Sequence, residues 1–181
     1  MTEDEIINGC KQNNKQCQYA LFRMYAGRMM SVCLRYASTK PEAEDMLQNA
    51  FIKIFNAINQ YRHEGAFEGW IRKITVHECL ASLRKKNIKY TDNIPDAIAN
   101  TNELLSISQI SEKELITMIN KLPEGYRVVF NLHIIEGYSH DEIAAMLNVE
   151  PVTSRSQLLK ARKLLQKQLL SQQKITATHD R

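Results

Sequence analysis

Glycine and proline are scarce in this chain, with only 6 and 4 residues among 181. Leu, Ile, Lys, Gln, Glu and Ala recur instead, a composition that favours helices over a turn-rich sheet protein. We therefore expect an all-α protein. A hydrophobic content of 44% is enough to build helical cores, either in one ordinary domain or in two small ones.

Metal-binding and secretory signals are also missing. The four cysteines form no C-x-x-C pair and, with the five histidines, match no common zinc spacing, so we expect reduced, buried thiols and no metal or other cofactor. The start of the chain, from Met1 to Glu5, lacks the basic and apolar parts of a signal peptide. No stretch approaches the ~18 apolar residues that cross a bilayer. We expect a soluble, cytoplasmic protein without membrane insertion.

Catalytic motifs are absent as well. The chain contains no G-x-x-x-x-G-K-[ST], H-E-x-x-H, G-x-S-x-G or G-x-G-x-x-G. Its scattered Asp, His and Ser residues are not paired at catalytic spacing. We therefore expect a protein that is not an enzyme.

Apolar residues at helical spacing predict three helices in the first half of the chain, near residues 16–37, 41–59 and 67–86. In the second of these, Phe51, Ile52 and Phe55 widen the apolar surface well beyond one stripe. Such an excess either lies inside the domain or serves a partner. A polar stretch follows, and we predict a first domain over residues 1–90 and a linker over 91–111.

The second half of the chain has the pattern of a helix-turn-helix, which we place in a second domain over residues 112–174, followed by a tail over 175–181. Ser139 and Glu142 fit a capping box at the start of one helix, and Pro151 opens the next. At ~100° per residue, Ser154 and Leu158 fall on the buried side of this last helix. The outward side and its flanks then carry Thr153, Arg155, Ser156, Leu159, Lys160 and Lys163.

Charge is distributed unevenly. The net charge is a modest +4, but no acidic residue lies between Glu150 and Asp180, where six Lys and Arg residues fall. A basic helix alone is usually just a solvated face. Joined to a capped helix and a turn, it indicates contact with DNA phosphates.

A second basic surface is predicted on the helix near residues 67–86, where Lys73, His77 and Arg84 lie within about 40° of one another. Tyr61, Phe67 and Trp70 precede them. Aromatic rings beside cations suit single-stranded DNA, because the rings stack on unpaired bases while the cations follow the backbone. Phe67 and Trp70 fit a core position equally well.

Several of these segments resemble a known family. The stretches Cys33 to Tyr36, Ala43 to Phe51 and Phe67 to Ile74 closely resemble region 2 of extracytoplasmic-function (ECF) sigma factors in the sigma-70 family. Region 4 of that family is resembled by Leu122-Pro123, Arg127, Glu142-Ile143-Ala144, Thr153, Ser156, Leu158 and Ala161-Arg162. The likeness covers nearly the whole chain, in the family's order.

The resemblance implies an alternative sigma factor that binds core RNA polymerase and promoter DNA and that is restrained by an anti-sigma factor. It implies a surface that docks on a coiled coil of the largest polymerase subunit, formed by Asp45, Gln48, Asn49, Phe51, Ile52 and Phe55. It also implies capture of the melted minus-10 strand and reading of the minus-35 element. The implied DNA-binding residues are Tyr61, Trp70, Lys73, His77, Arg84, Lys85 and Lys86 in region 2, and Thr153, Arg155, Ser156, Gln157, Lys160 and Lys163 in region 4.

Some positions depart from the family pattern. His77 stands where Asn is common, Ala81 where Asp is common, Ser154 where Val is common, and Gln157 where a basic residue is frequent. The first two departures affect the expected minus-10 contacts, so these cannot be transferred unchanged from the family.

Two other non-catalytic classes remain open from the sequence. A regulator of the LuxR or response-regulator type would also carry a basic reading helix, but it leaves the segment from Asp45 to Phe55 unexplained. A helical interaction protein would show negligible affinity for DNA.

Overall fold

The computed structural model describes residues 1–85 and 111–179, except for the side chains of residues 112, 113 and 172–179. The chain forms two compact units that divide between residues 87 and 88. The described residues are helical throughout, with short connections and no strand among them. The expected all-α class is confirmed.

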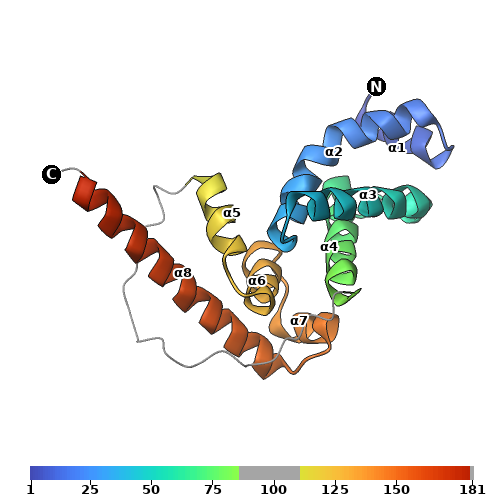
Figure 1. Ribbon diagram of the computed structural model, residues 1–181. Helices are drawn as coiled ribbons and strands as arrows, with labels where there is room; N and C mark the ends of the chain where they lie inside the picture. The colour runs from blue at the N-terminus through green and yellow to red at the C-terminus, as the bar shows by residue number, and fades with distance from the viewer. Residues whose placement is uncertain (86–110, 180–181) are drawn as a thin grey trace. The chain divides into compact units, whose positions relative to one another are not determined.

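The first unit contains α1 (Glu3–Lys11), α2 (Lys15–Tyr36), α3 (Lys40–Ala57), the 3-10 turn η1 (Ile58–Gln60) and α4 (Phe67–Lys85). The sequence reasoning missed α1, which begins at a Thr2 capping box. This short helix packs against α2, where the Tyr25 hydroxyl donates to the Glu3 carboxylate. Figure 1 shows α1 beside the first part of α2.

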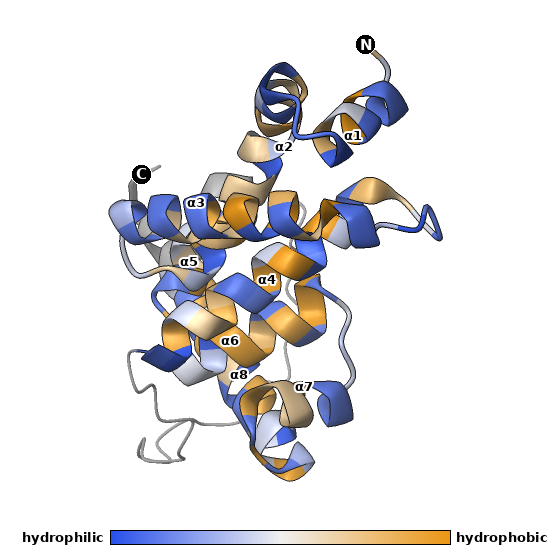
Figure 2. Ribbon diagram, turned by 90° about the vertical axis from the view of Figure 1, so that its right-hand side faces the viewer, coloured by the Kyte–Doolittle hydropathy of each residue, from blue (hydrophilic) through white to orange (hydrophobic). Residues whose placement is uncertain are grey.

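The core of the first unit lies where α2, α3 and α4 meet. Its central side chains, which include Leu21, Met29, Ile54, Phe67 and Ile71, are at most 1% exposed. Apolar and polar segments alternate along α3 and α4 in Figure 2, as expected of helices with one buried side. Burial of these side chains supplies the main stabilisation of the unit.

The four cysteines are free and buried, and all of them belong to this unit. Cys33 on α2 and Cys79 on α4 lie with their sulfur atoms 3.9 Å apart. Burial, followed by the neighbouring Cys17, raises the pKa of Cys10 to about 11. The Cys10 thiol is therefore protonated near neutral pH, as expected of a buried cysteine.

The second unit contains α5 (Glu112–Asn120), α6 (Glu124–Phe130), the π-helical turn η2 (Asn131–Ile135), α7 (His140–Leu147) and α8 (Pro151–His179). Its core joins α5 and α6 to α8 through Met118, Leu122, Tyr126, Ala161 and Leu165. The stretch Val128-Val129-Phe130 is helical and ends α6.

The helix-turn-helix of α7 and α8 has the predicted end signals. Ser139 and Glu142 form the capping box, since the Ser139 hydroxyl accepts from the Glu142 amide and the Glu142 carboxylate accepts from the Ser139 amide. Asn148 adopts the left-handed conformation, with φ 54°, and turns the chain between the two helices. Pro151 begins α8, which continues to His179.

Candidate functional surfaces

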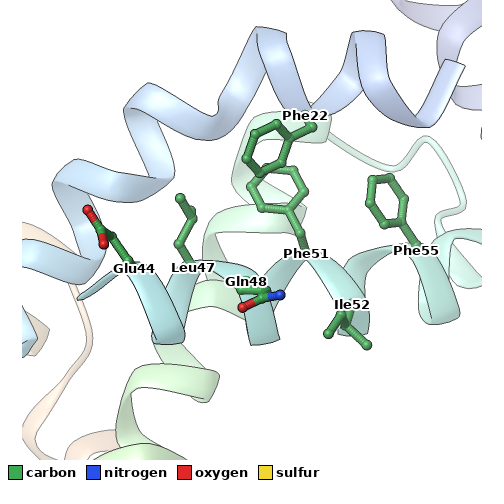
Figure 3. A pocket seen from close by; sticks show the side chains of 7 residues that line it. All are labelled: Phe22, Glu44, Leu47, Gln48, Phe51, Ile52 and Phe55. Atoms are coloured by element: carbon green, nitrogen blue, oxygen red, sulfur yellow. The ribbon is translucent and has the colours of Figure 1, made fainter. Parts of the chain in front are cut away.

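An apolar groove of about 510 Å³ runs along α3 (Figure 3). Leu47, Phe51, Ile52 and Phe55 from α3 and Phe22 from α2 line it, with Glu44 and Gln48 at its polar side. The Phe22 and Phe51 rings meet edge to face with centroids 4.8 Å apart, so the groove has a firm aromatic wall. An open apolar groove with a polar rim is the kind of surface that accepts a partner helix.

The six predicted polymerase-binding residues occupy this region of α3 in different ways. Asp45, Gln48, Asn49 and Ile52 are exposed and Phe55 is half-buried. Phe51 is only 3% exposed and belongs to the core cluster, and it also lines the groove. It shapes the groove from below.

Three groove residues, Phe22, Glu44 and Leu47, were not predicted as site residues. Phe22 comes from α2 and is 37% exposed. The sequence carried no signal for this, because the groove forms only when α3 packs across α2.

A second pocket, of about 500 Å³, lies where the loop after η1 enters α4. Tyr61 and Trp70 line it, with ring centroids 5.5 Å apart, and Arg62 and Lys73 add positive charge. The Tyr61 hydroxyl donates to the Gly65 carbonyl at 2.6 Å, which holds the loop against the ring. Burial, and then Glu3 and Asp4, raise the pKa of Tyr61.

The structure separates the three aromatic candidates of this region. Phe67 is 1% exposed and lies in the core, where it contacts both Tyr61 and Trp70. Tyr61 is 8% exposed and Trp70 is half-buried, so each presents part of its ring to the pocket. The sequence left open whether these rings are core residues or available to DNA. Phe67 is a core residue, and Trp70 is partly available at the pocket.

A basic face follows along α4, where Lys73, His77, Arg84 and Lys85 are exposed. Lys86 lies outside the described residues. Partial burial, and then Arg84, Lys53 and Lys73, lower the pKa of His77. Lys53 was not predicted for this face. It comes from α3, where its ammonium group pairs with the buried carboxylate of Glu78.

The outward face of α8 carries most of the predicted duplex-binding residues. Arg155 is exposed, and Thr153, Ser156, Lys160 and Lys163 are partly exposed. Gln157 is 1% exposed, beside the buried Leu158, so the expectation that it contacts DNA is corrected: its side chain packs inside the unit. Val152 and Leu159 are 65% and 55% exposed and add apolar area to the face.

Two kinds of feature were not found among the described residues. No group of three or more His, Cys, Asp or Glu side chains there is placed to hold a metal ion. Among those same residues, no helix has both the length and the apolar character to span a bilayer.

Known solved structures share this fold. The sigma factor RpoE of Bartonella quintana, solved with the anti-sigma factor NepR, matches with a TM-score of 0.52 and 18% identity over 83% of this chain and 95% of that one. CnrH, solved with the cytosolic domain of CnrY, matches with a TM-score of 0.50 and 16% identity over 92% and 96%.

Sequence relatives extend along nearly the whole chain. The ECF RNA polymerase sigma factor SigE of Mycolicibacterium smegmatis is 30% identical over 164 residues, which are 87% of this chain and 63% of that protein. The ECF RNA polymerase sigma-E factor of Escherichia coli K12 is 25% identical over 178 residues, 91% of this chain and 93% of the relative. The corresponding factor of Haemophilus influenzae is 24% identical and covers 93% and 96%.

Two family models match, and together they span more than half of the chain. Residues 21–88 match sigma-70 region 2, and residues 112–165 match sigma-70 region 4. The first match includes the groove of α3 and the pocket at the start of α4, and the second includes α7 and the reading helix α8. The chain belongs to the sigma-70 family, in its ECF class, and is a transcription initiation factor without enzymatic activity.

Proposed function

We propose that this sigma factor divides its work between its two units at the boundaries that the sequence predicts. Residues 1–90 bind core polymerase and the minus-10 element, residues 91–111 link the units, and residues 112–174 read the minus-35 element, with a tail over 175–181. The observation that carries this proposal is the presence of an apolar groove and an aromatic pocket on the first unit and a basic reading helix on the second.

The groove of α3 receives a helix of the largest polymerase subunit. Ile52, 51% exposed, and the half-buried Phe55 offer apolar contact, while Asp45, Gln48 and Asn49 are free to orient the partner through polar contacts. Phe51 supports the groove without being its main contact surface. This combination is typical of helix-in-groove recognition.

The aromatic pocket holds an unstacked base of the minus-10 strand. Stacking of this base on an aromatic ring contributes about 1–3 kcal/mol. Lys73, His77, Arg84 and Lys85 then follow the backbone of the same strand, and Lys86 belongs to this proposal by sequence alone. Opening the duplex becomes favourable because stacking within DNA is exchanged for stacking on protein.

The outward face of α8 enters the major groove at the minus-35 element. Arg155 is the best-placed residue to read a base edge, because it is exposed in the first turns of the helix. Thr153, Ser156, Lys160 and Lys163 contribute further base or phosphate contacts. Gln157 is left out of this surface because of its burial.

An anti-sigma factor completes the proposed set of partners. Both solved neighbours were obtained with another protein, and for RpoE that protein is named as an anti-sigma factor. The exposed groove and basic faces of this chain are surfaces that such a partner can cover. We place the protein in the cytoplasm, where core polymerase and promoter DNA are found.

Reconstitution tests the proposal directly. The purified chain is mixed with sigma-free core polymerase and a genomic library of templates, and new RNA starts are sequenced. We expect starts that share upstream elements at the minus-10 and minus-35 spacings. A regulator of the LuxR type would bind duplex DNA but add no starts, and that outcome would overturn the proposal.

A further inference from the structure

Two histidines are stacked where α7 meets α8. The rings of His133, in η2, and His140, the first residue of α7, lie with centroids 4.3 Å apart and planes 14° from parallel. Nδ1 of His140 is 2.9 Å from the hydroxyl of Ser154 on α8, and Nδ1 of His133 is 2.8 Å from the Tyr138 carbonyl. These contacts join three successive elements of the second unit.

Hydrogen-bond chemistry assigns the proton on His133. A carbonyl oxygen only accepts, so Nδ1 of His133 donates to Tyr138 and its Nε2 is unprotonated in the neutral ring. Between neutral His140 and Ser154, either group can donate. Once His140 is protonated, its Nδ1 can only donate to the Ser154 hydroxyl, and the ring becomes a cation stacked on its neighbour.

The surroundings oppose that cation. Burial, and then His133 from η2 and Arg155 and Arg162 from α8, lower the pKa of His140, while Asp141 on its own helix acts in the other direction. The folded second unit therefore favours the neutral form of His140. Protonation weakens the packing between α7 and the first turns of α8, because it places positive charges side by side.

The position of Ser154 connects this pair to DNA reading. Its side chain is 0% exposed and faces the unit's interior, while the next residue, Arg155, is exposed on the reading face. A shift of the α8 backbone at Ser154 also moves Arg155 and Ser156, because neighbouring residues of a helix are held together by its backbone hydrogen bonds. Contacts to base edges tolerate little displacement.

We propose that the contact from His133 through His140 to Ser154 positions α8 for sequence reading, and that protonation of His140 weakens this positioning. The inference rests on the proposed reading of the minus-35 element by α8. His140 and Ser154 are positioning residues here and need no contact with DNA themselves. The effect lies below about pH 6.5, the ordinary pKa of histidine, because the pKa of His140 is lowered.

Selective and unselective binding respond to protonation in opposite directions. An added positive charge near α8 strengthens attraction to any duplex, since phosphate contacts do not depend on sequence. Loss of positioning weakens only the contacts to base edges. The ratio of the two affinities therefore separates a positioning role from a simple charge effect.

The experiment uses the full chain. A duplex is first enriched from a random pool at about pH 7.5, and its affinity is compared with that of an unselected duplex of equal length by fluorescence anisotropy. Both affinities are followed down to about pH 5.5 at constant ionic strength. Three variants are compared with the wild type: His140→Asn, Ser154→Ala, and His63→Asn as a control in the first unit.

We expect the affinity ratio of the wild type to fall about tenfold over this range, the loss that corresponds to one weakened contact to a base edge. His140→Asn keeps a hydrogen-bonding group near the position of Nδ1 but does not titrate, so it retains the ratio at pH 7.5 and loses its pH dependence. Ser154→Ala lowers the ratio already at pH 7.5. His63→Asn behaves as the wild type does.

Other results overturn the inference. It is wrong if the wild-type ratio stays constant, or if His140→Asn shows the same fall. Backbone NMR of the wild type during a pH titration tests the inference without any variant. The amide signals of Arg155 and Ser156 must shift at the same midpoint pH as the His140 ring signals. Shifts at a different pH, or no shifts, contradict the inference. If no duplex is enriched and core polymerase gains no starts, the proposed function itself fails.

Discussion

Phe51 and Ile52 are neighbours on α3 but have different environments. Successive residues of a helix are rotated by ~100°. Phe51 turns inward against Phe22 and is 3% exposed, whereas Ile52 is 51% exposed. The sequence left open whether this apolar excess is buried or serves a partner, and the structure shows both. Phe51 belongs to the core, and Ile52 is available to a partner.

Replacing Ile52 by Ala tests the partner side of this division. We expect core polymerase binding to weaken about tenfold, because a buried Ile contributes roughly 1.5–3 kcal/mol and Ala retains part of that. The free energy of unfolding should change by less than about 0.5 kcal/mol, since the side chain is exposed in the free protein. A competition assay with labelled wild-type protein measures the binding.

The matched control is Tyr19→Ala. Tyr19 is also a large, exposed apolar residue, 64% exposed on α2, but it does not line the groove. Its removal should leave polymerase binding unchanged. Equal losses for the two variants would mean that the groove is not the docking surface.

Replacing Phe51 by Ala tests the core side. Loss of a buried Phe ring should lower the free energy of unfolding of the first unit by about 3–5 kcal/mol. Urea titration followed by tryptophan fluorescence measures this. A small loss of stability with a large loss of polymerase binding would contradict this prediction, because it would mean that Phe51 contacts polymerase directly.

At the scale of the helices, α8 combines a buried side that packs against α6 and α7 with a basic side that lacks acidic residues. The two sides serve separate purposes, since apolar packing holds the helix and the cations face outward. Arg155 and Lys167 are both exposed cations on this helix, three turns apart. Only Arg155 lies in the proposed reading segment.

Arg155→Ala should weaken binding to a selected minus-35 duplex by about 1–3 kcal/mol and reduce its sequence preference. Lys167→Ala removes the same charge outside the reading segment. It should weaken selected and unselected duplexes equally and by less. Titrations at several salt concentrations distinguish the two, and matching behaviour of both variants would argue against base reading by Arg155.

Several elements were predictable because their signals are local. The capping box at Ser139 and the proline at position 151 each determine a helix start through groups within one turn. Helix α1 was missed because only Ile6, Ile7 and Cys10 mark its buried side, too few to establish a period. The burial of Gln157 agrees with helical spacing, which places it about 40° from the buried Ala161, whereas the family resemblance assigned it to the DNA-binding residues.

At the scale of the whole molecule, the distribution of cysteines allows unfolding of the first unit to be followed separately from unfolding of the second. All four thiols lie in the first unit and are buried. We expect them to resist alkylation in the native protein and to react together when the first unit unfolds. Labelling in increasing urea, read by mass spectrometry, checks this. Reaction of any thiol at the full rate without urea would contradict its burial.

Trp70 is the only tryptophan of the chain, and it stands in the wall of the aromatic pocket. A nucleobase that stacks against an indole ring quenches its emission. The unmodified protein therefore has an optical reporter for strand capture, while engagement of duplex DNA by α8 passes without a signal. Stopped-flow mixing of holoenzyme with a promoter can time the opening of DNA separately from its first recognition.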